Sequence, residues 1–127
     1  MKKDPRITDA EWQVMKILWE KAPITSLALV EILQSRIGWK PTTVYTLVSR
    51  LVTKKAVMVD KSSSPYVCTP LLSEQECRRA ERNSFLQKAY DGSLSMLVVN
   101  LLEENELSAN EIEHLKRVLA NKKGKER

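Results

Sequence analysis

The segment that follows Pro41 carries several short hydroxyl side chains and one guanidinium group. In a helix, at about 100° per residue, they fall on the side opposite an apolar stripe. This polar face consists of Thr42, Thr43, Thr46, Ser49, Arg50 and Thr53. Short hydroxyls approach base edges and phosphates closely, and a guanidinium donates hydrogen bonds to either. The face therefore suits the reading of DNA in a major groove.

Lysines flank this face. Lys40 precedes it, Lys54 and Lys55 follow it, and Lys61 lies further along the chain. They are suited to phosphates on both sides of a groove. Tyr45 lies at the margin of the face, so its ring could pack against the second helix, toward the core, or its hydroxyl could reach a base or phosphate, and the sequence leaves both roles open. A polar helix face taken alone is more often only solvated surface, so the elements around it must decide.

Catalytic and metal-binding patterns find little support. The chain has only three glycines and one histidine, and it contains no glycine-rich phosphate loop, no GxSxG and no HExxH motif. Cys68 and Cys77 do not form a CxxC or CxC pair, whereas a structural zinc site usually has four ligands at recognisable spacing. We therefore expect no enzyme, no metal site and no cofactor.

Composition fits a small folded protein with an anionic partner. The 127 residues are 43% apolar and 29% charged, with a formal net charge of +5. This length allows one or two small domains, and the charge favours nucleic acid or acidic membranes. Met1–Arg6 does not lead into the apolar core of a signal peptide, and the densest apolar stretch, residues 96–102, is far below the roughly 20 residues that span a bilayer. We expect a cytoplasmic protein without membrane insertion.

Two amphipathic helices are predicted ahead of the polar face. The first covers about residues 9–21 and starts at a capping box, in which Thr8 caps the free amides and Glu11 reaches back. The second is capped by Thr25 and ends at Gly38. Both helices have apolar residues at helical spacing, which predicts a structural role.

A third helix and a hairpin follow. The helix starts at Pro41, and its inward stripe consists of Val44, Leu47, Val48, Leu51 and Val52. The runs 56–61 and 65–70 are rich in β-branched and aromatic residues and are joined by serines, which predicts a hairpin. This order of elements predicts a winged helix, in which the third helix docks in the groove and the hairpin lies along the backbone. Charge and topology together favour DNA binding.

A helical second domain is predicted from residue 73. Ser73 and Glu76 form a capping box that opens a charged helix, and Gly92 breaks it. Residues 94–102 form a nearly all-round apolar helix, and Ser108 caps the last one. The predicted fold is mainly α with a small β-hairpin: an N-terminal winged helix-turn-helix DNA-binding domain over residues 1–72 and a C-terminal helical dimerisation domain over residues 73–127.

A second copy of the chain is the expected partner of the C-terminal domain. About 55 residues are too few to bury such an apolar helix well. A twofold pair also reads a palindrome, whereas one winged helix contacts few base pairs. The residues expected at the dimer interface are Phe85, Leu86, Tyr90, Leu94, Leu97, Val98, Leu101, Leu102, Ile112, Leu115 and Leu119.

Nearly the whole chain resembles the BlaI/MecI/CopY family of bacterial repressors. The resemblance is carried by WKPTTVYTLVSRL at residues 39–51 and by ITDAEWQVM at residues 7–15. Further matches are Phe85 and Leu86, the run YDG at residues 90–92, and LVVNL at residues 97–101. The resemblance implies a winged helix, a helical dimerisation region and a dyad operator built from TACA and TGTA elements.

The resemblance also bears on base preference and regulation. Members commonly carry a basic residue where this chain has Thr42 and a polar or basic one at Tyr45, so the preferred bases can differ. In the β-lactamase and methicillin branch, a membrane sensor-protease signal leads to cleavage after an Asn and before a Phe, and the matching bond here is Asn100–Leu101. The copper branch carries CxC motifs near the C-terminus, and residues 121–127 contain no cysteine.

The sequence thus predicts a homodimeric transcriptional repressor that binds palindromic double-stranded operator DNA. It is expected to control a β-lactamase or other antibiotic-response operon and to lose activity when it is cut near Asn100–Leu101. The alternative from another class is a winged-helix module that docks on a partner protein without sequence-specific DNA binding.

Overall fold

The computed structural model describes residues 6–125 of the chain. The prediction that no signal peptide is present depends on Met1–Arg6, of which residues 1–5 lie outside this range. The chain divides into two compact units, Met1–Asn83 and Ser84–Arg127, and each is described by itself. Within the described residues, no helix combines the length and the apolar character that crossing a bilayer requires.

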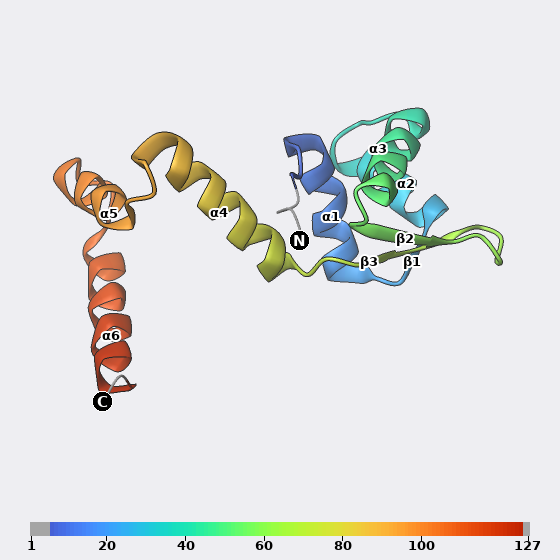
Figure 1. The fold of residues 1–127 in the computed structure, drawn as a ribbon. Coiled ribbons are helices and arrows are strands. Elements are labelled where there is room, and N and C mark those ends of the chain that lie inside the picture. Colours follow the sequence, from blue (N-terminus) through green and yellow to red (C-terminus); the bar gives the residue numbers. More distant parts are fainter. Residues whose placement is uncertain (1–5, 126–127) are drawn as a thin grey trace. The chain divides into compact units, whose positions relative to one another are not determined.

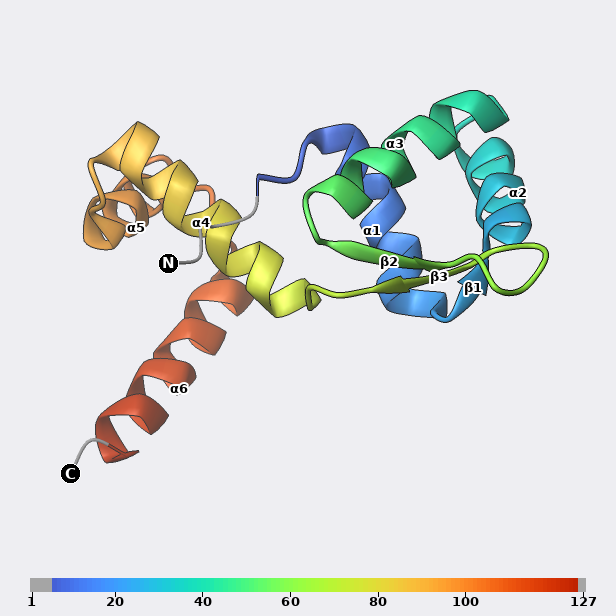
Figure 2. The same cartoon turned by 45° about the vertical axis from the view of Figure 1, so that its right-hand side comes forward.

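Residues 9–70 of the first unit form three helices and three strands, shown in two views in Figures 1 and 2. The loop between its last two strands projects beyond the helices in both views. The elements in chain order are α1 (Asp9–Lys21), β1 (Ile24–Thr25), α2 (Ser26–Arg36), α3 (Pro41–Thr53), β2 (Val57–Asp60) and β3 (Val67–Pro70). The predicted order of three helices and a hairpin is confirmed.

Local capping explains where the first helices start. Thr8 Oγ1 accepts a hydrogen bond from the Glu11 N–H at 3.1 Å, and Glu11 Oε1 accepts one from the Thr8 N–H at 2.9 Å. Thr25 Oγ1 accepts a hydrogen bond from the Ala28 N–H at 3.1 Å. These bonds satisfy amides that have no partner within the helix. The capping box and the cap predicted from the sequence are therefore both present.

Apolar side chains from all three helices meet in one core. Met15 and Leu18 of α1, Leu29 of α2 and Leu51 of α3 are fully buried there. Val52, which we expected in the inward stripe of α3, is instead 41% exposed. Eight residues after Val44, Val52 is rotated by about 80° from it, outside the arc of the buried residues. The stripe is therefore narrower than predicted.

The hairpin is part of a three-stranded antiparallel sheet of order β1-β3-β2. In the pair of β2 and β3, Val59 lies opposite Cys68. The short β1 pairs with β3, with Ile24 opposite Cys68, and the Ser26 N–H donates to the Tyr66 carbonyl at 2.8 Å. The sequence did not predict β1, because two residues carry no alternating pattern.

A long helix, α4 (Glu74–Tyr90), begins in the first unit and ends in the second. The predicted capping box is formed, since Ser73 Oγ accepts from the Glu76 N–H at 3.0 Å. The predicted domain limit at Leu72 precedes α4, whereas the two compact units separate after Asn83. The first half of α4 lies with the first unit, and its Cys77 and Ala80 are buried.

The second unit holds the end of α4 together with α5 (Leu94–Glu103) and α6 (Ala109–Lys125). Asp91 and Gly92 have φ angles of 49° and 84°, in the left-handed region that ends a helix and favours glycine. Ser93 caps α5, and Ser108 forms a capping box with Glu111. Although α5 is strongly apolar, none of its residues is buried.

Candidate DNA-binding face

The polar face predicted for α3 is a solvent-exposed surface. Pro41 occupies the first turn of the helix, where its missing N–H costs nothing. The buried residues of α3 then fix the orientation of the helix and turn the opposite side outward. The exposed residues on that side are Thr42, Thr43, Thr46, Ser49, Arg50 and Thr53. The helix has no acidic residue, so nothing on it repels a phosphate.

A shallow hollow of about 270 Å³ lies on this face. Thr42, Thr43, Thr46 and Arg50 surround it, and the largely buried Leu47 also lines it. Hydroxyls and a guanidinium around an apolar patch match the edge of a thymine, where a methyl group stands beside a carbonyl oxygen. The hollow can therefore accept a base edge as well as a phosphate.

Tyr45 is not a core residue, since 45% of it is exposed. Its ring lines a separate, larger cavity together with residues of α2 and of the hairpin. Tyr45 is therefore not buried in the core, although its ring lies beside residues of α2 as one of the two predicted roles requires. The tyrosine stands instead at the edge of the polar face.

Three of the predicted lysines lie exposed around α3. Lys40 is the N-cap residue, Lys55 follows the last turn with a φ of 63°, and Lys61 follows β2. Next to Lys61, Asp60 Oδ1 accepts hydrogen bonds from the Ser62 N–H at 2.9 Å and from Ser62 Oγ at 2.6 Å. These bonds lower the pKa of Asp60 and order the start of the hairpin loop.

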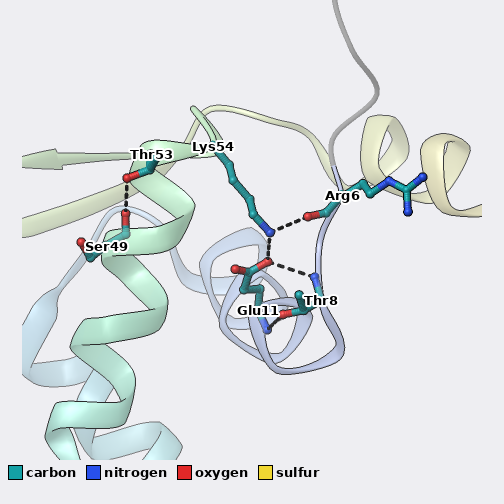
Figure 3. A network of polar contacts seen from close by, with 6 residues as sticks. All are labelled: Arg6, Thr8, Glu11, Ser49, Thr53 and Lys54. Carbon is teal, nitrogen blue, oxygen red and sulfur yellow. Dashed lines mark hydrogen bonds and ion pairs between the residues drawn. The ribbon is translucent and has the colours of Figure 1, made fainter.

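Lys54 differs from these three lysines, because its ammonium group is paired with other groups of the protein (Figure 3). Its Nζ lies 2.6 Å from Glu11 Oε1 and donates to the Arg6 carbonyl at 2.6 Å. The same carboxylate oxygen accepts the capping bond from Thr8. Lys54 therefore ties the C-terminal end of α3 to the start of α1. Beside it, Thr53 Oγ1 donates to the Ser49 carbonyl at 3.1 Å.

Glu11 is the buried charge of this network, with 1% of its surface exposed. Burial of the carboxylate raises its pKa, but hydrogen bonds from Lys54 and Thr8 and the positive charge of Lys54 outweigh that effect and hold the pKa below its usual value. Sequence reasoning identified Glu11 only as a helix cap. Its partner lies 43 positions away, and no local pattern connects the two residues.

The cysteines are free and buried, and the described residues hold no group of three or more His, Cys, Asp or Glu side chains placed to bind a metal ion. Burial raises the pKa of the Cys68 thiol. Burial, together with the charge of Glu76, does the same for Cys77. Both thiols are therefore protonated at neutral pH and are weak nucleophiles.

The residues predicted for dimerisation occupy different environments in the second unit. Leu86 is already buried within its own chain, and the rings of Phe85 and Tyr90 pack edge to face with centroids 5.8 Å apart. Half-buried residues are Tyr90, Leu97, Leu101 and Ile112. Exposed ones are Phe85, Leu94, Val98, Leu102, Leu115 and Leu119. Met96, Val99 and Val118 are exposed as well; Met96 and Val99 belong to the segment 94–102 predicted for the interface, whereas Val118 was not predicted.

A helix-turn-helix followed by a sheet and a projecting hairpin, with a polar and basic face on its third helix, defines the first unit as a winged-helix domain. Consistent with this class, the family model described as penicillinase repressor matches residues 7–121. The chain therefore belongs to the penicillinase repressor family, whose members are transcriptional repressors and not enzymes. The family resemblance seen in the sequence is confirmed.

Individual relatives agree with this assignment. The chain is 35% identical to the penicillinase repressor of Bacillus licheniformis over 127 residues, which cover 100% of this chain and 99% of the relative. It is 34% identical to the methicillin resistance regulatory protein MecI of Staphylococcus aureus (strain N315) over 117 residues, or 92% of this chain and 94% of the relative.

Two solved structures match part of the chain. One is the solution structure of the DNA-binding domain of the repressor BlaI, with 36% identity and a TM-score of 0.54. The other is Bacillus licheniformis BlaI in its monomeric form in complex with the blaP half-operator, with 36% identity and a TM-score of 0.52. Each match covers 60% of this chain and 93% of the other.

Proposed function

We propose that this protein represses transcription by inserting α3 into the major groove of operator DNA, where it prevents access to a promoter. The observation that carries the proposal is the exposed face of α3, on which hydroxyls, a guanidinium and flanking lysines occur without an acidic residue. The similarity to BlaI bound to a half-operator supports it. A repressor of this kind works in the cytoplasm, where bacterial DNA lies.

Residues of the face divide into base readers and phosphate contacts. Thr46 and Arg50 line the hollow on α3 and are assigned to base edges, together with Thr42, Thr43 and Ser49. Lys40, Lys55 and Lys61 are exposed and are assigned to phosphates. Tyr45 stands at the edge, from which its hydroxyl can reach the backbone.

Lys54 takes a different part in this proposal. Its side chain is 32% exposed and its ammonium is paired with a buried carboxylate. A lysine held in this way contributes mainly by fixing the end of α3, so it is a positioning residue and a minor phosphate contact. The neighbouring Lys55, which has no such partner in the described structure, carries more of the phosphate attraction.

The apolar surface of the second unit supports dimerisation. None of the residues of α5 is buried, and α6 adds exposed leucines and a valine. A second copy of the chain removes this surface from water, and each Å² of apolar area that is buried contributes about 25 cal/mol of favourable free energy. The resulting homodimer presents two α3 helices to a palindrome built from TACA and TGTA elements.

Induction, the relief of repression, is proposed to act through α5. The bond between Asn100 and Leu101 lies inside α5, where the Asn100 carbonyl accepts from the Glu104 N–H at 3.1 Å and the Leu101 carbonyl accepts from the Glu106 N–H at 3.0 Å. A protease must open this turn before it cuts. Cleavage after a membrane sensor-protease signal then removes part of the dimer surface and releases a β-lactamase or other antibiotic-response operon.

Operator binding is tested by fluorescence anisotropy with a TACA/TGTA dyad and a scrambled duplex at two salt concentrations. We expect preferential, salt-sensitive binding of two chains per dyad. Combined T46A and R50A substitutions should abolish the preference, whereas R36A should leave it unchanged, because Arg36 lies at the end of α2 and pairs with Glu20 at 3.6 Å. Equal, weak binding to both duplexes refutes the proposal and favours a protein-docking module.

A further inference from the structure

A cavity of about 480 Å³ lies between α2, α3 and the β2–β3 hairpin. Its walls include the fully buried Leu29 and Val44, while Leu27, Tyr45 and Tyr66 line it as large exposed side chains, 52%, 45% and 45% exposed. Small-molecule sites usually have volumes of roughly 300–1,000 Å³ and mostly apolar walls. The cavity has that size and that composition, and the proposed contacts with DNA do not explain it.

The lining residues indicate the chemistry of an occupant. None of them is charged, so the cavity offers no cation to a phosphate and no partner to an ammonium group. Ser26, Ser64 and the two tyrosines supply hydroxyl groups, and the rest of the lining is aliphatic or aromatic apart from the protonated thiol of Cys68. An occupant that matches these walls is apolar and neutral and has one or two hydrogen-bonding groups, and an aromatic ring suits the two tyrosine rings of the lining.

We propose that this cavity binds a neutral aromatic molecule of one or two fused rings bearing a hydroxyl group, and that its occupation weakens binding to operator DNA. The walls come from the two elements that a winged helix applies to DNA: Val48 and Tyr45 belong to α3, and Val59 and Tyr66 to the hairpin. An occupant engages both tyrosine rings and fixes the hairpin against α3. The second half of the proposal rests on the proposed function.

Reciprocity links the two binding events. If the occupant lowers operator affinity by a given factor, operator DNA lowers the affinity for the occupant by the same factor. Because the cavity lies in the first unit, this weakening of operator binding needs no proteolysis and no change in the second unit. It is a separate route by which a small molecule regulates the same DNA-binding face.

Binding is tested with 2-naphthol as the probe and the ¹⁵N-labelled full chain, without DNA. We expect saturable amide shifts confined to the segments that line the cavity. V59F fills the cavity and should weaken binding at least tenfold. M58F is the matched control, because Met58 is the neighbouring residue of β2, is exposed and does not line the cavity, so its affinity should stay within twofold of wild type.

A second variant keeps the test independent of how V59F folds. Y66A removes one exposed ring and should weaken 2-naphthol binding at least threefold, while the Tyr66 carbonyl that accepts from Ser26 remains. Shifts that do not saturate, or an affinity for V59F and Y66A equal to that of wild type, overturn the site.

The effect on DNA is measured separately. Saturating 2-naphthol should weaken binding to the TACA/TGTA dyad at least fivefold in wild type and less than twofold in Y66A. Unchanged operator affinity overturns the regulatory half of the proposal. If the dyad is not preferred even without 2-naphthol, the proposed function has failed, and the amide titration still decides whether the site exists.

Discussion

Replacing Glu11 by glutamine tests whether the buried carboxylate holds the winged helix together. The substitution keeps the shape of the side chain but removes the charge that lies 2.6 Å from Lys54 Nζ. A hydrogen bond to a charged group is worth about 1.5–3 kcal/mol. Lys54 is partly exposed and can turn to water, so the larger penalty of a stranded buried charge does not apply in full. We expect a loss of about 2 kcal/mol.

Urea and thermal unfolding followed by tryptophan fluorescence measure this loss. The three tryptophans, Trp12, Trp19 and Trp39, all lie in the first unit, so the signal reports on the winged helix alone. In a domain of this size, 1 kcal/mol shifts the midpoint of thermal unfolding by roughly 4–8 °C, so E11Q should lower it by about 8–16 °C.

The matched control is E74Q. Glu74 also pairs with a cation, Arg78 at 2.8 Å, but both side chains are largely exposed, so its loss should stay below about 0.5 kcal/mol. A double-mutant cycle of E11Q with K54M should give a coupling energy above about 1 kcal/mol. A loss in E11Q no larger than in E74Q, or a coupling energy near zero, refutes the reasoning.

Three further predictions follow from the same structure. The pKa of Glu11 is lowered in the folded state, so the stabilisation by its carboxylate is present above the unfolded pKa of about 4.3 and is lost as the pH falls through the folded pKa. The difference in free energy of unfolding between wild type and E11Q, measured in urea, should therefore shrink on acidification. A difference that stays constant with pH contradicts this. L94D combined with L102D should give monomers in analytical ultracentrifugation, since both leucines are exposed on α5, and a dimer unchanged by the two charges contradicts the interface. In the proposed dimer each substitution changes two lysines per dyad, so K55A should reduce the magnitude of the slope of log Kobs against log salt by about 1.8, at about 0.9 per phosphate contact, and K54A should reduce it by less. Anisotropy titrations measure both slopes, and equal slopes would show that Lys54 is an ordinary phosphate contact.

Local patterns predicted the elements of the fold because each depends on neighbours in sequence. The capping box of Thr8 and Glu11 joins positions three apart, and the buried stripe of α3 follows the helical period. The two runs of the hairpin are long enough to show an enrichment in β-branched and aromatic residues, which is typical of strands. The helix starts, the third helix and the hairpin can therefore all be recognised in the sequence.

Features that depend on distant residues were not predictable in this way. The partner of Glu11 is Lys54, and the partner of β1 is β3, and neither pairing leaves a local signal. Lys54 and Lys55 look alike in sequence, yet only the first is held by a buried carboxylate. The exposed face of α3 was predictable because the helical period of one segment separates its buried residues from its exposed ones. The role of each lysine, in contrast, depends on tertiary packing.

In the proposed repressor the two units depend on each other for an energetic reason. One α3 presents a few short hydroxyls and one guanidinium, and a good bidentate base contact contributes only about 1–3 kcal/mol. A single winged helix therefore distinguishes few sites in a genome. In the proposed dimer, the apolar surface of α5 and α6, which the second unit leaves exposed, would join two such faces and make the second contact intramolecular. On this proposal, breaking α5 near Asn100 should weaken operator binding far more than the loss of any one contact, because it would return the two half-sites to independent binding.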